Sequence, residues 1–237
     1  MSHEHHHHHG EIKHKNAFVI GIALNLILVG AEVFYGLLAN SSALLADAGH
    51  NASDVLSLVF AWAAAWLATK KPTKKHTYGY EKTTILVSIL NAFLLFGAVA
   101  LIGWDAFQKI KNPEPVAGST VMMVAGIGVV INTLTALLFL KGQKDDLNIR
   151  GAYLHMAADA AVSLAVVVGG VLIITTGFHI IDPILSFIIM IVIVWSTWRL
   201  LVESVNLALD AVPNEIDLEE VRSFLLNTEG VEGVHDL

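Results

Sequence analysis

The chain of 237 residues contains no cysteine, which excludes disulfide bonds and metal sites built on thiolates. Charged residues are scarce too: they make up 15% of the chain, against about 25% in typical soluble domains. The 14 Lys and Arg residues are few and stand beside apolar segments, so no nucleic-acid partner is expected. No HExxH sequence is present, which excludes the usual zinc-protease motif. These absences together favour a membrane protein that is not an enzyme.

What the sequence does contain is a series of long apolar stretches, and its mean hydropathy is +0.64. Stretches of about 20 residues are long enough to cross, as helices, a hydrocarbon core about 30 Å thick. Polar His residues precede the first stretch, so no cleavable signal peptide is expected. The sequence therefore predicts an all-α membrane protein, a six-transmembrane-helix bundle with helices at residues 17–38, 42–69, 83–108, 119–140, 148–176 and 181–209.

The distribution of Lys and Arg predicts how these helices are oriented. Twelve of these residues lie in the N-terminal tail, the second and fourth connections and the C-terminal side, whereas the other three connections hold only Lys109 and Lys111. Basic residues concentrate on the cytoplasmic side of membrane proteins. Both the N- and the C-terminus are therefore expected to face the cytoplasm.

The two ends of the chain differ in composition from the apolar region, so we expect three parts. Residues 1–16 form a His-rich cytoplasmic tail, which is either an expression tag or a native tract that gathers metal ions. Residues 17–212 form the six-helix transmembrane domain. Residues 213–237 carry many acidic residues and resemble a soluble helix followed by the start of a strand. Twenty-five residues cannot bury a core, so this part is expected to be the start of a truncated domain.

Two short sequences inside the apolar stretches, HNASD and HMAAD, carry the chemistry of this chain. Each places a His and an Asp four residues apart, on one face of a helix: His50 with Asp54, and His155 with Asp159. Two such helices facing each other offer two imidazoles and two carboxylates, a ligand set that suits tetrahedral zinc. The sequence therefore predicts a site for a divalent metal ion within the bilayer.

The depth of the two pairs supports one shared site. The second helix enters the membrane from the outside and the fifth from the inside. At 1.5 Å per residue, Asp54 lies about 18 Å along the second helix and Asp159 about 16 Å along the fifth. Both carboxylates thus reach the middle of the membrane. The second and fifth helices are also the central members of two three-helix halves, and a Ser-Leu pair follows each motif (Ser57-Leu58 and Ser163-Leu164). This pattern hints at a 3+3 inverted repeat of the kind that secondary transporters use.

An alternative for the four residues is that they form hydrogen bonds between helices and merely hold the bundle together. Ser, Thr or Asn would do so at a lower desolvation cost, because each acidic residue at mid-membrane costs about 2.5–3.5 kcal/mol on insertion scales. The metal site is therefore the favoured interpretation.

Other polar residues in the apolar stretches are accessory candidates. Asp47 lies three residues before His50, near the same face of the helix. Four roles are open for it: a hydrogen-bond acceptor that orients an imidazole, a spare metal ligand, a charge that guides ions toward the site, or a solvated residue in an outward vestibule. We expect Glu32 to line a hydrophilic pathway, and Asn25 and Asn132 to serve helix packing.

Asp182 and His179 flank the short turn before the sixth helix. One interpretation is that they sample metal ions at the exit. The other is structural, since Asp182 followed by Pro183 is an ordinary helix start. The structural interpretation is favoured for His179 and, less clearly, for Asp182.

These features together resemble the cation diffusion facilitator family, and the resemblance spans nearly the whole chain. A lone HxxxD pattern is not specific, but the combination is. The segments that carry the resemblance are ALLADAGHNASDVLSL, YGYEK, HMAADAAVSL, DPILS, LVESVNLALDAVP and EGVEGVHDL.

The resemblance implies a six-helix metal/proton antiporter that exports zinc from the cytoplasm, usually as a homodimer. Carried over by position, the transport site is His50, Asp54, His155 and Asp159, with Zn²⁺ as substrate rather than cofactor. Members with His at the first of these positions prefer zinc, whereas Asp there accompanies cadmium or other divalent ions. The expected location is a bacterial inner membrane, and the partners are divalent cations, protons and the lipid bilayer.

Two departures from the family pattern stand out. Members continue into a cytoplasmic ferredoxin-like domain, of which residues 213–237 are only the start. Some relatives also hold a second metal ion between the second and third helices; His76 is present there, but Thr73 and Tyr80 stand where its other ligands are expected. A complete second site of this kind is not predicted.

The mechanism that these expectations suggest is alternating access around a fixed site. Two neutral imidazoles and two carboxylates make a net-neutral complex with Zn²⁺, and protons release the metal on the outer side. Imidazole, with a pKa near 6.5, is the expected proton carrier. A channel and a membrane-bound metal sensor or scaffold without transport are the alternatives.

Overall fold

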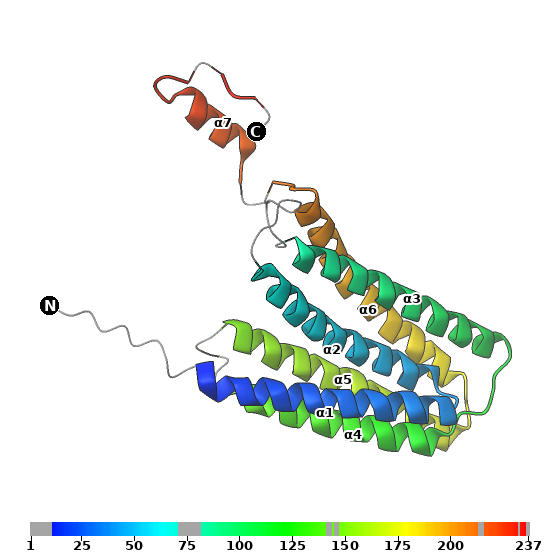
Figure 1. The fold of residues 1–237 in the computed structure, drawn as a ribbon. Helices are drawn as coiled ribbons and strands as arrows, with labels where there is room; N and C mark the ends of the chain where they lie inside the picture. The colour runs from blue at the N-terminus through cyan, green and yellow to red at the C-terminus, as the bar shows by residue number, and fades with distance from the viewer. Residues whose placement is uncertain are drawn as a thin grey trace.

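The computed structural model describes residues 11–70, 82–140, 144, 147–212, 216–231 and 233–235. Within these ranges the chain forms helices and no strand, so the all-α prediction is confirmed for this part of the chain. The helices are α1 (Glu11–Leu38), α2 (Ser42–Ala68), α3 (Thr83–Lys111), α4 (Gly118–Phe139), α5 (Leu147–Thr176), α6 (Ile181–Ala208) and the short α7 (Leu218–Leu226) (Figure 1).

The six long helices end close to the predicted positions, with two exceptions. Helix α1 begins at residue 11 instead of 17, and α3 ends at residue 111 instead of 108. In both places polar residues with good helix propensity continue the helix beyond the apolar stretch, for example Lys13 in α1 and Lys109 in α3. Hydropathy locates the part of a helix that lies in lipid, whereas propensity decides where the helix itself stops.

Helices α1 to α6 run side by side in alternating directions (Figure 1). The connections at residues 39–41, 112–117 and 177–180 lie at one end of the bundle, which we call the short-loop end. The opposite end, where α1 begins and α6 ends, is the tail end. Helix α2 is central, because it packs against α1, α3, α5 and α6. Helix α7 lies beyond the tail end, apart from the bundle (Figure 1).

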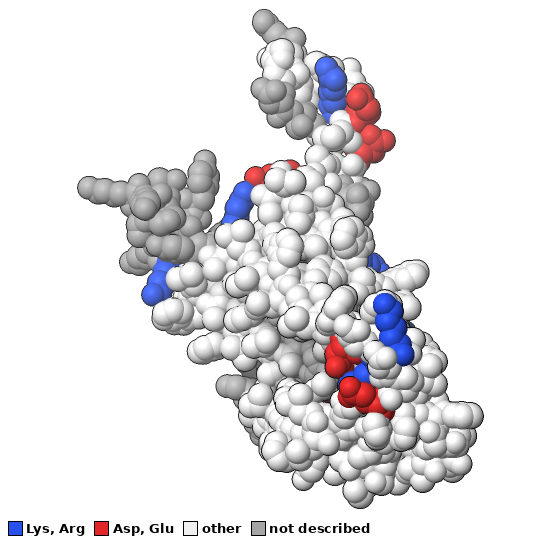
Figure 2. Space-filling view, turned by 90° about the vertical axis from the view of Figure 1, so that its right-hand side faces the viewer, with Lys and Arg blue, Asp and Glu red and all other residues white. Residues whose placement is uncertain are grey.

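The outside of the bundle is apolar. Trp62, Leu101 and Trp195 are 73%, 76% and 78% exposed, and many other large hydrophobic side chains also point outward. Figure 2 shows a surface with few charged side chains, several of them gathered in one small group. A soluble protein does not present such a surface to water, whereas lipid chains solvate it at no cost. The protein is therefore an integral, multi-pass membrane protein.

Among the described residues, five helices are long and apolar enough to cross a membrane: α3 to α6 and the Val19–Leu38 part of α1. Helix α2 is of similar length, and several polar side chains lie along it. Several of these side chains, including Asp47, Asn51 and Ser53, are buried against the neighbouring helices. The number of six membrane spans and the orientation of the termini remain predictions.

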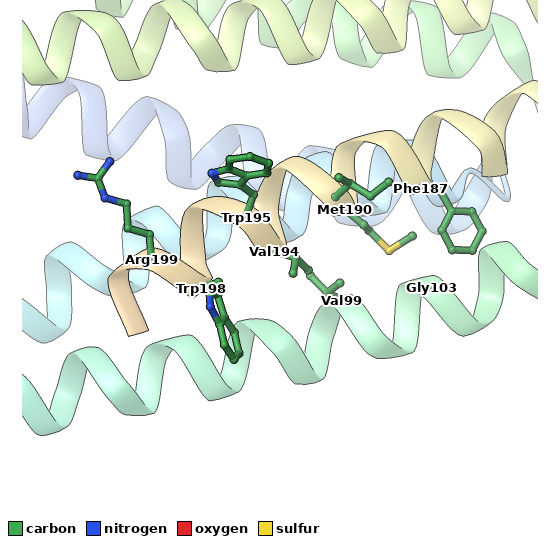
Figure 3. Close-up of a pocket in the computed structure, with 9 residues that line it drawn as sticks. Val99, Gly103, Phe187, Met190, Val194, Trp195, Trp198 and Arg199 are labelled. Carbon is green, nitrogen blue, oxygen red and sulfur yellow. The ribbon is translucent and has the colours of Figure 1, made fainter. Parts of the chain in front are cut away.

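An apolar groove of about 630 Å³ lies between α3 and α6. Figure 3 shows its lining, with Val99 and Gly103 on α3 facing Met190 and Val194 on α6, and with Arg199 near one end. Apart from Arg199 the lining is apolar, and it offers no oxygen or imidazole ligand for a metal cation. The groove is therefore a lipid- or protein-facing feature, and the chemistry lies elsewhere.

Helices α4 and α5 form the closest helix pair, because glycines let their backbones touch. A Cβ atom on Gly170 would lie 2.9 Å from the Met122 backbone nitrogen and 3.0 Å from the Gly118 carbonyl oxygen. Small residues at such crossings are typical of membrane helix pairs. Helix α5 carries half of the candidate site, so this contact fixes its position.

We expect Gly170→Ala to destabilise the protein by about 1–3 kcal/mol, because the atoms that the new methyl group would meet belong to the backbone and cannot rotate away. The matched control is Gly126→Ala on α4, where a Cβ meets nothing within 4 Å and the helix gains propensity. Thermal unfolding of the purified protein in detergent measures both. An unchanged melting temperature for Gly170→Ala would contradict this prediction, because it would show that α4 and α5 move apart at little energetic cost.

Candidate metal site

The four residues of the two motifs come from α2 and α5, which run in opposite directions (Figure 1). Asp54 is the twelfth residue after Ser42 at the start of α2, and Asp159 is the twelfth after Leu147 at the start of α5. At 1.5 Å per residue each carboxylate lies about 18 Å along its helix. Because the helices enter from opposite ends, the two pairs arrive at the same level of the bundle.

The side chains meet in an alternating arrangement of imidazoles and carboxylates. His50 Nε2 lies 3.8 Å from Asp54 Oδ2 on its own helix and 3.3 Å from Asp159 Oδ1 on the other. His155 Nε2 lies 3.7 Å from Asp159 Oδ2 and 3.3 Å from Asp54 Oδ2. The ring centroids of the two imidazoles are 6.1 Å apart. Each imidazole nitrogen therefore stands between two carboxylates.

These distances can be compared with those in a tetrahedral zinc complex. Bonds of about 2.0–2.2 Å from zinc to nitrogen and oxygen separate neighbouring ligand atoms by about 3.3–3.5 Å. Two of the four distances have this length and the other two exceed it by a few tenths of an ångström. One ligand atom each from His50, Asp54 and Asp159 lies within 4.8 Å of the other two. His155 lies outside this group of three, so its side chain would have to move for all four ligands to surround one ion.

Three of the four carboxylate oxygens in this cluster lack hydrogen bonds to the described residues. Both oxygens of Asp159 and Oδ2 of Asp54 are buried and have no hydrogen-bond partner in the part of the chain that the structure describes. Imidazole nitrogens face these oxygens at 3.3–3.8 Å without donating a hydrogen bond, so a cation or a proton between the side chains is expected to stabilise them. The donor set of two nitrogens and two anionic oxygens fits a divalent transition metal.

In the part of the chain that the structure describes, a cavity on the side of the tail end reaches the cluster. The side chain of His155 is 41% exposed, that of Asp54 25%, that of His50 17% and that of Asp159 1%. A cavity of about 290 Å³ leads to His155 and Asp54, and its lining includes Asn25 near the middle of α1 and Gly151 near the start of α5. An ion can therefore reach the cluster from the tail end, while packed side chains separate it from the short-loop end.

Two accessory candidates, Asp47 and Glu32, lie on that closed side. Asp47 accepts a hydrogen bond of 3.0 Å from the Ser163 hydroxyl, and Glu32 accepts one of 3.0 Å from the Asn51 side-chain amide. Both carboxylates are fully buried. Asp47 is therefore not a solvated vestibule residue in this state of the protein.

Asp182 lies at the short-loop end, where it caps the N-terminus of α2. Its carboxylate accepts hydrogen bonds from the Ser41 hydroxyl, from the Ser42 backbone N–H at 2.7 Å and from the Ala43 N–H at 3.4 Å. Free N–H groups at a helix start favour an anion. His179 accepts a hydrogen bond of 3.0 Å from the Val116 N–H. The structure does not bring either residue to the cluster of His50, Asp54, His155 and Asp159.

Two further accessory residues, Asn25 and Asn132, are also buried. Asn25 lines the cavity, and neither polar atom of the Asn132 side chain has a hydrogen-bond partner among the described residues. His76, Thr73 and Tyr80 lie outside the described residues, as do the first ten residues of the His-rich tail.

Sequence reasoning missed the polar network beside the Asp182 cap. Lys109 donates to the Asn40 carbonyl oxygen and the Ser42 hydroxyl, and lies 2.7 Å from Asp105. The positive-charge pattern of the sequence identifies Lys109 only as a charge in a connection between helices. Its spacing of four residues from Asp105 on one helix was a signal that the two side chains pair.

Comparison with known proteins agrees with this architecture. Residues 18–207 match the profile of the cation efflux transmembrane domain. The chain belongs to the cation efflux family. The resemblance to the cation diffusion facilitators is thereby confirmed, and the protein is a transporter of the cation efflux type.

Relatives of this cation efflux protein occur in several bacteria. It is 35% identical to the metal cation efflux system protein CzcD of Cupriavidus metallidurans over 99% of this chain and 73% of the relative. It is 35% identical to the zinc transporter ZitB of Escherichia coli, over 94% of this chain and 72% of that protein. It is 34% identical to the cadmium, cobalt and zinc/H(+)-K(+) antiporter of Bacillus subtilis, over 100% of this chain and 76% of the relative.

Proposed function

We propose that this cation efflux protein exports Zn²⁺ in exchange for protons, by alternating access around His50, Asp54, His155 and Asp159. The observation that carries the proposal is the alternating cluster of two imidazoles and two carboxylates at one level of the bundle. Two neutral imidazoles and two carboxylates balance the charge of one Zn²⁺ ion. A neutral complex is what a low-dielectric membrane interior tolerates.

The names of the relatives support zinc and proton exchange. ZitB is a zinc transporter, and the Bacillus subtilis relative is an antiporter whose name includes H(+) and zinc. The Lys and Arg distribution supports a cytoplasmic tail end, with six spans that include α2. On this orientation the cavity beside His155 opens to the cytoplasm, and the structure represents the inward-facing state that receives zinc. The proposed location is a bacterial inner membrane.

Zinc uptake into proteoliposomes tests the proposal. We expect Zn²⁺ added on the side of the tail end to cross at a rate that rises at least tenfold when the opposite side is made acidic, because protons entering there drive the exchange. A zinc-sensitive dye inside the vesicles reports the flux. Zinc binding without flux would favour a sensor or scaffold, and flux independent of the pH gradient would favour a channel; either result would contradict the proposal.

We also propose a homodimer, which the family resemblance implies. The apolar groove between α3 and α6 provides a surface for such a contact that involves none of the four site residues. Native mass spectrometry of the protein in detergent tests this: a dimer mass is expected, and a monomer at all concentrations would contradict it.

A further inference from the structure

Two carboxylates outside the His–Asp cluster remain without an explained role. Asp47 precedes His50 by three residues on α2, about one turn closer to the short-loop end. Glu32 lies on the facing part of α1, and both side chains are 0% exposed. Ser163, the hydrogen-bond donor to Asp47, is one turn beyond Asp159 on α5. This second layer of polar side chains therefore lies on the closed side of the cluster.

The two carboxylates belong to one buried polar region of the bundle. Asn51 donates a hydrogen bond to Glu32 Oε2, and Ser163 donates one to Asp47 Oδ2. The donor–acceptor distance is 3.0 Å in both. A Cβ atom on Gly128 of α4 would lie 3.4 Å from Glu32 Oε1 and 3.1 Å from Ser163 Oγ. The Glu32 carboxylate and the Ser163 hydroxyl that donates to Asp47 thus both lie beside Gly128. Helices α1, α2, α4 and α5 all contribute to this layer.

Three oxygens of this layer are buried and unsatisfied. Glu32 Oε1, Asp47 Oδ1 and Asn51 Oδ1 have no hydrogen-bond partner among the residues described. Their residues are each 0% exposed. The cost of burying carboxylates in this way is several kcal/mol unless a positive charge compensates them. Apolar or neutral polar side chains would pack here at lower cost, so packing does not explain two acidic residues. Buried carboxylates with unsatisfied oxygens are what a cation site requires.

We propose that Glu32, Asp47 and the side-chain oxygen of Asn51 form a second divalent-cation site, the outer station, which holds the ion between the His–Asp cluster and the short-loop end. This inference rests on the proposed function. Two carboxylates balance one divalent charge, so the ion stays neutralised as it moves outward. The outer station offers only oxygens, and such a set binds Zn²⁺ less tightly than one with imidazole. Weaker binding at the last station favours release.

Amide substitutions distinguish cation binding from a structural role. Glu32→Gln and Asp47→Asn keep an oxygen that accepts the existing hydrogen bond, but each removes a negative charge. Equilibrium dialysis of the full chain at saturating Zn²⁺ measures the number of ions bound. We expect each variant to bind one zinc ion fewer per chain than the wild type, while the Kd of the tight site stays within threefold. Zinc uptake is expected to fall at least tenfold.

Glu114→Gln is the matched control. Glu114 is exposed in the connection between α3 and α4, where it accepts a hydrogen bond from the Asn40 side-chain amide, and it is not one of the outer-station residues. Its zinc stoichiometry and uptake are expected to equal those of the wild type. Thermal unfolding confirms that each variant is folded, and either amide variant alone decides the outcome.

An unchanged number of bound zinc ions in a folded amide variant would overturn the outer station, whatever the rate of uptake. Loss of zinc binding at the His–Asp cluster in an amide variant would also overturn it, because Glu32 and Asp47 would then act by supporting that cluster and not by binding an ion of their own. Failure of the proposed function has a different signature, because the wild type itself would then show no zinc uptake.

Discussion

Asp159→Asn is expected to weaken zinc binding at least 100-fold and to reduce zinc uptake to the background of empty vesicles. The amide keeps the shape of the side chain but leaves the zinc complex with one uncompensated positive charge. Asp159 is 1% exposed, so water does not screen that charge. A 100-fold change in Kd corresponds to about 2.8 kcal/mol. Isothermal titration calorimetry and proteoliposome uptake measure the two effects.

Asp210→Asn is the control for this substitution. Asp210 follows the end of α6, is 75% exposed and lies 2.8 Å from the exposed Lys82 ammonium. An exposed ion pair of this kind contributes about 0–1 kcal/mol to stability. The control is expected to bind and transport zinc as the wild type does. Wild-type binding and uptake in Asp159→Asn would rule out the His–Asp cluster as the transport site.

Zinc affinity is expected to fall at least 100-fold between about pH 7.5 and pH 5.5, because protons compete with zinc for the two imidazoles. A protonated ring nitrogen has no lone pair for zinc, so protons must leave both rings before zinc binds, and affinity falls as the solution becomes acidic. Calorimetry at both pH values measures the change.

His155→Ala provides the internal comparison, since it leaves one imidazole in the cluster. Its zinc affinity is lower at every pH, but it is expected to fall only about tenfold over the same pH interval. A wild-type affinity that does not change with pH, or that rises as the solution becomes acidic, would contradict proton competition at this site. The proposed antiport would then need another proton carrier.

Much of the fold followed from local patterns. The helices are where apolar stretches are long enough to span lipid, and spacing by four residues placed His50 beside Asp54 and His155 beside Asp159. The level at which the two pairs lie followed from helix rise and chain direction. These are properties of single helices, so they depend on neighbours in sequence. Periodicity and length therefore predicted them well.

The contacts made across the bundle did not follow from such patterns. Asp182 caps α2 from a position 140 residues further along the chain, and Ser163 reaches Asp47 from another helix. The rotation of each helix about its own axis decides which polar side chains meet, and this rotation depends on close packing such as that of Gly170 against α4. A sequence pattern of one helix contains no information on the rotation of its partner.

The sequence by itself determined that the chain lies in a membrane, that it belongs with proteins that move metal cations, and which four side chains are its candidate ligands. The tertiary structure decided that the cluster is open at the tail end and closed at the other, and that Glu32 and Asp47 lie together behind it. The physical reason is that ligand identity and spacing belong to the local chain. Access and burial belong to the way six long helices pack around one another.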